Sequence, residues 1–213
     1  MSAHLAALAA RFRRDTSGVA LLEFALTLPI LLLLSLTGAE LTNYITTKMR
    51  VSQISLHLAD NAARIGSGSQ LALKTISESD INDLFIGANM QSGELALQTN
   101  GRIILSSVEE DSAHTGKYKI GWQRCYGSKT SHGSTYGVAG ANNLTGVGPT
   151  GRQVTAPSGG AAMFVEVYYE YQPLVKTSLA PANNFIEIAS MMVRDRRDLT
   201  QVYAVSGVTA STC

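Results

Sequence analysis

The feature that most constrains this chain is a nearly uninterrupted apolar run close to its N-terminus. Residues 21–39 read LLEFALTLPILLLLSLTGA, with Glu23 as the one charge and Pro29 as the one proline. An α-helix rises about 1.5 Å per residue, so the run is just long enough to cross a hydrocarbon core of about 30 Å. We therefore expect residues 19–39 to form a membrane-spanning helix.

The charges on either side of this run predict its orientation. Arg11, Arg13 and Arg14 precede it, and no cationic residue follows before Lys48. Because cytoplasmic flanks carry the excess of lysine and arginine, the N-terminus is expected in the cytoplasm and the chain after residue 40 outside. In a bacterium this describes a single-pass protein of the inner membrane with a periplasmic C-terminal domain.

Two ordinary interpretations of the run leave its carboxylate unexplained. A secretory signal would place the small residues Thr37 and Ala39 at the usual cleavage positions. A plain uncleaved anchor would account for the length alone. Neither explains Glu23, because an ionisable group at mid-bilayer costs roughly 2.5–3.5 kcal/mol and usually marks function.

A third interpretation explains both the length and the carboxylate. The stretch RRDTSGVALLEFALTLPILL resembles a prepilin signal: a basic leader, then Gly18, then an apolar helix from Val19 with Glu23 as its fifth residue. The Glu23-Phe24 pair and the later proline are most similar to the TadE-like minor pilins, or pseudopilins, of tight-adherence (Tad, Flp-type, type IVc) pilus systems. The resemblance is sharp over residues 11–36 and diffuse afterwards.

This resemblance implies a processing step, partners and a function. A prepilin peptidase would remove the leader, residues 1–18, by cutting between Gly18 and Val19. The partners would be that peptidase, other major and minor pilins bound through the N-terminal helix, and the inner-membrane assembly platform. The chain would be a non-catalytic minor subunit that initiates, primes or caps a pilus, supports adhesion or secretion, and passes from the inner membrane into the pilus.

A physical argument for the carboxylate stands apart from the family. Cleavage after Gly18 would create a positive α-amino group on Val19, about one helical turn from Glu23. Within one chain the two groups satisfy each other poorly, whereas a neighbouring subunit can supply the missing partner. We therefore expect Glu23, with Phe24 beside it, to set the register of one helix against the next.

The helix is predicted to continue past the membrane. Apolar residues recur at spacings of three, four or seven from Leu41 to Ile65, and no proline interrupts residues 30–65. A periplasmic continuation over residues 40–66 is therefore expected, ending at Gly66. The alternative is two helices with a break near Gly38. Either way the fold class is α+β and pilin-like, with a long N-terminal helix packed on a small antiparallel sheet.

Residues 67–213 are expected to form the periplasmic head. Ser79 or Asp80 could cap a short helix that carries Ile81, Leu84 and Phe85 on one side. Asn100-Gly101 then predicts a hairpin between strands at residues 94–99 and 102–108. Further strands are predicted at residues 117–126, 163–172 and 185–195, the last pairing with the one before it. A loop rich in glycine and serine is expected at residues 127–160.

Two cysteines, Cys125 and Cys213, are present. In a periplasmic domain they favour one disulfide, which would close a loop of nearly 90 residues and contribute about 4 kcal/mol on the loop-entropy relation. The alternative is two free thiols.

Catalytic, metal and nucleic-acid sites find no support in the composition or the motifs. A net charge of +1 with 15% charged residues gives no electrostatic case for nucleic acid. His4, His57, His114 and His132 lack acidic partners at ligand spacing. The acidic run at residues 109–111 is interpreted as a solvated turn. No catalytic residue, metal or cofactor is assigned, and the alternative function is a membrane-anchored periplasmic binding protein outside any pilus.

Overall fold

The chain is α+β in a computed structural model, which describes residue 11 and residues 17–68, 72–175 and 181–213. It divides into two compact units, residues 1–44 with 173–181 and residues 45–172 with 182–213. In chain order the elements are α2 (Ser17–Arg64), α3 (Glu78–Ser92), η1 (Gly93–Leu95), α4 (Leu97–Asn100), β1 (Gly101–Glu110), β2 (Tyr118–Tyr126), β3 (Ala161–Glu170) and β4 (Asn184–Met192).

The long N-terminal helix is continuous. α2 covers 48 residues without a break at Gly38, so the predicted continuation past residue 40 is confirmed and the two-helix alternative is wrong. Pro29 lies inside it. Two threonines of its apolar part donate their hydroxyl hydrogens to backbone carbonyls one turn earlier: Thr27 to Glu23 at 2.9 Å and Thr37 to Leu33 at 2.7 Å. The hydroxyl groups are therefore hydrogen-bonded within the helix itself.

A four-stranded antiparallel sheet forms the centre of the second unit. The strand order is β2-β1-β3-β4, so β1 and β3 are the inner strands. Ile104 of β1 lies opposite Cys125 on one side and Glu166 on the other, which fixes the register across the sheet. Both inner strands are buried on both faces. β3 is almost entirely apolar, whereas β1 also buries the polar residues Arg102, Ser106, Ser107 and Glu109. The predicted strands at residues 117–126, 163–172 and 185–195 are confirmed, with β4 pairing with β3 as expected.

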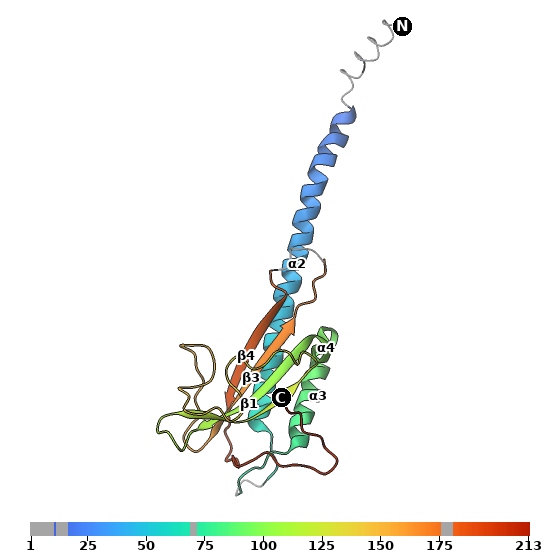
Figure 1. The fold of residues 1–213 in the computed structure, drawn as a ribbon. Helices are drawn as coiled ribbons and strands as arrows, with labels where there is room; N and C mark the ends of the chain where they lie inside the picture. The colour runs from blue at the N-terminus through green and yellow to red at the C-terminus, as the bar shows by residue number, and fades with distance from the viewer. Residues whose placement is uncertain (1–10, 12–16, 69–71, 176–180) are drawn as a thin grey trace. The chain divides into compact units, whose positions relative to one another are not determined.

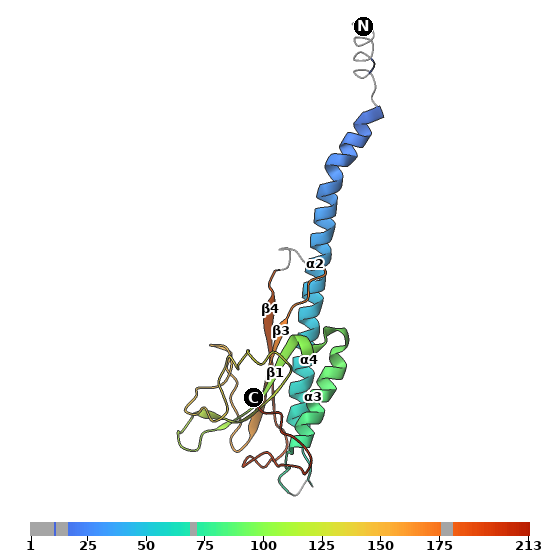
Figure 2. The same cartoon turned by 45° about the vertical axis from the view of Figure 1, so that its right-hand side comes forward.

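Helices cover one face of this sheet. Within the second unit, α3 and the C-terminal part of α2 lie side by side along the strands (Figures 1 and 2). Val51, Ile54, Leu58 and Ala62 of α2 are buried at the predicted three- and four-residue spacing. Two contacts attach α3 to the sheet: Phe85 stacks on Tyr126, and the Glu78 carboxylate pairs with the Arg124 guanidinium of β2.

The other face is covered by the glycine-rich segment at residues 127–160, which lies across the sheet from α3 in Figure 2. It contains no named helix or strand, as predicted for a loop, yet it is packed rather than free. Val147 joins Val108, Ile120, Ala162 and Phe164 in a hydrophobic cluster. Tyr136, Leu144 and Val154 pack around it. The segment therefore closes a second core, which its low apolar content concealed.

The predicted hairpin at Asn100-Gly101 is wrong. Residues 93–95 and 97–100 are helical, with Ala96 in a left-handed conformation between them, and Gly101 begins β1 with extended backbone (φ −134°). The side-chain amide of Asn100 donates to the Leu95 carbonyl at 3.2 Å, so asparagine closes a helical turn here. Glycine is needed for close approach: a Cβ at residue 101 would lie 2.6 Å from Leu97 Cδ1 and 3.0 Å from the Tyr168 carbonyl oxygen.

The cap of α3 lies two or three residues earlier than predicted. Ser77, not Ser79 or Asp80, is the N-cap, and it forms a capping box with Asp80. Asp80 Oδ2 accepts from the Ser77 amide at 2.9 Å, and the Asp80 amide donates to Ser77 Oγ at 3.3 Å. The serine-rich sequence contains several candidate N-cap residues, and the reciprocal hydrogen bonds between Ser77 and Asp80 identify Ser77 as the N-cap. The apolar side was predicted correctly, since Ile81 and Phe85 are fully buried.

The acidic run is not a solvated turn. Glu109 and Asp111 are buried, and Glu110 is the last residue of β1. Ser107 Oγ donates to Glu109 Oε1 at 2.8 Å, and burial raises the pKa of Glu109 above its usual range. Asp111 accepts the amide of Asn143 and contacts the His114 ring, and these hydrogen bonds lower its pKa. A β-strand end next to a packed loop buries carboxylates that the sequence places at a turn.

Candidate functional site

The N-terminal part of α2 exposes apolar side chains all around the helix. Between Val19 and Leu36 no residue is buried, and Leu21 is 76% exposed. Among the described residues, α2 is the one helix long and apolar enough to cross a membrane. A core helix of a soluble domain would bury most of this surface. The segment is therefore of the kind that anchors a protein in a membrane or serves as a signal sequence.

The residues of the predicted processing and docking site lie in the first two turns of α2. Gly18 and Val19 follow its first residue, and Glu23 and Phe24 come one turn later. Positions four apart share one face of a helix, so the carboxylate of Glu23 lies on the same side as Val19. Glu23 and Phe24 are both exposed. No ion pair forms to Glu23 from any residue that the structure describes.

The basic flank is described only in part. Arg11 is helical and exposed, whereas Arg13 and Arg14 lie outside the described residues. The orientation of the helix across a membrane is predicted from the distribution of charge along the sequence.

A second glutamate of the helix, Glu40, was missed by sequence reasoning. It is fully buried, and its Oε2 accepts the backbone amide of Val175 at 3.1 Å. The two residues are 135 positions apart, so no local pattern signals the contact. Their hydrogen bond joins the segment after β3 to the helix within the first compact unit.

The predicted disulfide is present. Cys125 of β2 is bonded to Cys213 across a sequence separation of 88 residues. The Cys125 amide also donates to the Ser211 carbonyl at 2.8 Å, so the last residues run alongside β2. Ser211 in turn donates to Asn82 Oδ1 of α3 at 2.7 Å. The C-terminal segment thus connects the outer strand of the sheet with the helix layer.

A buried carboxylate holds the loop against the sheet. Glu166 of β3 is 1% exposed, and its oxygens accept the amide and the hydroxyl of Thr135 and the hydroxyl of Ser134. His132 Nε2 lies 3.2 Å from Glu166 Oε1, and the His132 ring stacks on Tyr168. His114 and His132 therefore both have acidic neighbours. Asp111 lies three residues before His114, whereas Glu166 is brought to His132 by the fold across 34 residues.

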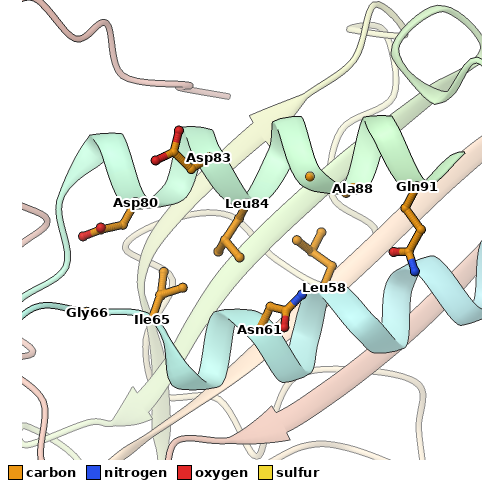
Figure 3. Close-up of a pocket in the computed structure, with 10 residues that line it drawn as sticks. Leu58, Asn61, Ile65, Gly66, Asp80, Asp83, Leu84, Ala88 and Gln91 are labelled. Carbon is orange, nitrogen blue, oxygen red and sulfur yellow. The ribbon is translucent and has the colours of Figure 1, made fainter.

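A hollow runs between α2 and α3. Its volume is about 700 Å³. Figure 3 shows Leu58 and Asn61 of α2, and Ile65 just after the end of that helix, across the hollow from Leu84 of α3. Its two acids are Asp80, which is engaged in the capping box, and Asp83 at the rim. The groove is mixed apolar and acidic in character, and its lining holds no cysteine, histidine or serine to act as a nucleophile or a base.

No group of three or more histidine, cysteine, aspartate or glutamate side chains in the described residues is arranged to hold a metal ion. In comparisons with protein-family models, curated proteins and solved structures, nothing matches the chain. The functional interpretation therefore depends on the residues themselves.

Proposed function

We propose that this protein is a minor pilin, or pseudopilin, that initiates, primes or caps assembly of a Tad-type pilus from the bacterial inner membrane. The observation that carries the proposal is the first part of α2, which is exposed and apolar on all sides. Its one carboxylate, Glu23, lies four residues after Val19, the residue that follows Gly18. Lipid can cover the apolar surface, but it offers a carboxylate no cationic partner at that depth.

The mechanism assigns each residue of this segment one role. A prepilin peptidase cuts the Gly18–Val19 bond on the cytoplasmic side, and Arg11, Arg13 and Arg14 keep that side in the cytoplasm. The new α-amino group of Val19 on one subunit then pairs with Glu23 of its neighbour. Phe24 packs beside this pair. Since each helix carries one donor and one acceptor at a fixed height, the pairing sets the register between subunits.

The first test is the N-terminus of the mature protein. Processing at the proposed site gives a chain that begins VALLEF. A mature start at Glu40, or an intact Met1, would overturn the pilin proposal, because no free amine would then lie one turn from Glu23.

The second test addresses docking through Glu23→Gln. We expect the variant to be inserted and processed normally, and to co-purify with partner pilins about tenfold less, as the loss of a charged hydrogen bond of about 1.5–3 kcal/mol implies. Glu94→Gln is the matched control, because Glu94 is an exposed glutamate outside the apolar segment. Equal co-purification of the wild type and the Glu23 variant contradicts the docking role.

A second candidate function is a membrane-anchored periplasmic binding protein that enters no pilus. The groove between α2 and α3 favours it, because Leu58, Ile65 and Leu84 line an open hollow of about 700 Å³ (Figure 3). The mature N-terminus separates the two candidates, since a binding protein of this kind would keep Met1 or begin at Glu40.

A further inference from the structure

A buried arginine without an anionic partner lies on the loop-covered face of the sheet. Arg102, the second residue of β1, is 6% exposed. Its Nη1 donates to the Gly127 carbonyl at 3.0 Å, and its Nε has no acceptor. Among the described residues no carboxylate lies within ion-pair distance of it. Burial of a charge is costly unless an opposite charge or several acceptors compensate it.

The other buried arginine shows what compensation looks like in this protein. Arg197 also has an Nε without an acceptor, but its two Nη atoms donate to the carbonyl oxygens of Ala62, Ala63 and Ile65 at 3.2, 3.3 and 2.6 Å. It therefore caps the C-terminal end of α2, where a cation also complements the helix dipole. This structural role explains Arg197. Arg102 has one carbonyl and no helix end.

Glu166, a carboxylate on the same face, does not pair with Arg102. Glu166 lies opposite Ile104, so it is the diagonal neighbour of Arg102 across the β1–β3 pair. Its oxygens are occupied by His132, Ser134 and Thr135. Arg102 and Glu166 therefore form no direct ion pair, and the Nε–H donor of the Arg102 guanidinium has no acceptor in the chain.

Arg102 is one of the residues that line a hollow. The hollow has a volume of about 510 Å³ and is formed between the sheet, the loop at residues 130–139 and the C-terminal segment. Ile104, Val138 and Ala139 supply apolar surface, and Thr130, Ser134 and Thr212 supply hydroxyl groups. A second guanidinium of the lining, that of Arg124, is paired with Glu78, so Arg102 is the cation of this wall without a carboxylate partner. A charged group in a wall of this mixed kind is typical of a small-molecule site, for which volumes of about 300–1,000 Å³ are usual.

We propose that the hollow over Arg102 binds a monocarboxylate with a small apolar body. A carboxylate matches the planar fork of a guanidinium with two parallel hydrogen bonds and brings the one negative charge that Arg102 lacks. A phosphate dianion would bring more charge than the one uncompensated cation neutralises. The carboxylate comes either from a free organic acid or from an acidic side chain of a polypeptide. This site is independent of pilin processing.

The test uses the full chain in detergent, with butyrate as the probe and ligand-observed NMR as the readout. Butyramide is the neutral probe of the same shape. We expect butyrate to bind at least about tenfold more tightly than butyramide, and Arg102→Gln to abolish that difference, as the loss of a charged hydrogen bond implies. Arg152→Gln, which removes an exposed arginine of the same loop, should leave butyrate binding unchanged.

Two further arms complete the test. Ala139→Trp blocks the rim of the hollow at an exposed position and leaves the buried charge in place, so it should weaken butyrate binding even if Arg102→Gln fails to fold. An acetylated Gly-Glu-Gly amide replaces butyrate in the last arm: binding of this peptide alone identifies a polypeptide carboxylate as the ligand. The proposal is overturned if neither probe binds, if butyrate and butyramide bind alike, or if Ala139→Trp changes nothing.

Discussion

Breaking the Cys125–Cys213 disulfide should destabilise the second unit by an amount that the structure allows us to work out. The bond joins residues 88 positions apart. On the loop-entropy relation, closing a loop of that length removes about 15 cal/mol/K from the unfolded chain, or about 4.6 kcal/mol at 298 K. Cys213→Ser is the cleanest perturbation, because Cys213 is exposed whereas Cys125 is buried in β2.

The native contacts of the C-terminal segment should survive this change. The Cys125 amide still donates to the Ser211 carbonyl, and Asn82 Nδ2 still donates to the Thr209 carbonyl at 2.9 Å. The folded state therefore keeps its geometry while the unfolded chain gains freedom. We expect the free energy of unfolding to fall by about 4–5 kcal/mol, which is a large part of the stability of a domain of this size.

The assay is guanidinium unfolding of the full chain in detergent, followed by tryptophan fluorescence. Trp122 is the one tryptophan in the sequence and lies in β2, three residues before Cys125. With a slope of about 4 kcal/mol per molar guanidinium, the midpoint should fall by about 1 M. The wild type in reductant should unfold with the variant. Equal midpoints for the wild type with and without reductant would refute the reasoning, since the closed loop would then not restrict the unfolded chain.

Two further predictions concern packing and charge in the same unit. Gly101→Ala should lower the free energy of unfolding by about 1–3 kcal/mol, because its Cβ would meet backbone and side-chain atoms at 3.0 Å or less. Gly87→Ala is the control: its Cβ would lie in open space on α3, so it should raise the free energy of unfolding by up to about 1 kcal/mol. Thermal unfolding of the two variants tests this difference. Glu109→Gln should raise stability at pH 7 and converge with the wild type below about pH 4. Burial raises the pKa of the Glu109 carboxyl, so its ionisation opposes folding above the ordinary carboxyl pKa, and this cost disappears when the carboxyl is protonated. Chemical unfolding at pH 7 and pH 4 measures the difference in stability. A variant less stable than the wild type at pH 7 contradicts the prediction.

The sequence predicted the elements whose residues follow one local rule throughout. α2 combines an apolar run with a three- and four-residue spacing and no interior breaker after Pro29, so its continuity was predictable. β3 is rich in β-branched and aromatic residues, and its partner β4 follows after Pro173. The cysteine pair was predictable because two cysteines allow one pairing. In each of these cases local preference and tertiary structure agree.

Predictions failed where a distant contact overrides the local preference. Asn100-Gly101 has the composition of a tight hairpin turn, but the Tyr168 carbonyl and Leu97 lie against Gly101. Residues 97–100 form a helical turn instead of a hairpin. Glu40 with Val175, and Glu166 with His132, are brought together over separations of 135 and 34 residues. No pattern within a window of ten or twenty residues contains that information. The hollow over Arg102 belongs to the same class, because four separate segments of the chain form it: residues 102–104, 123–125, 130–139 and 212–213.

One helix in this chain obeys two different packing rules, and the difference bears on what covers its first half. From Val51 to Ala62 a single face of α2 is buried, as expected for a helix on a sheet. From Val19 to Leu36 no face is buried, so the surface needs lipid, other helices, or each in turn. Lipid alone satisfies the leucines at no cost and penalises Glu23 by a few kcal/mol. Other helices satisfy both, provided that one of them brings a cation to the height of Glu23. A chain cut after Gly18 carries that cation, the α-amino group of Val19, on every copy. Sequencing the mature N-terminus therefore tests the cation of the proposed pair, and Glu23→Gln tests its anion.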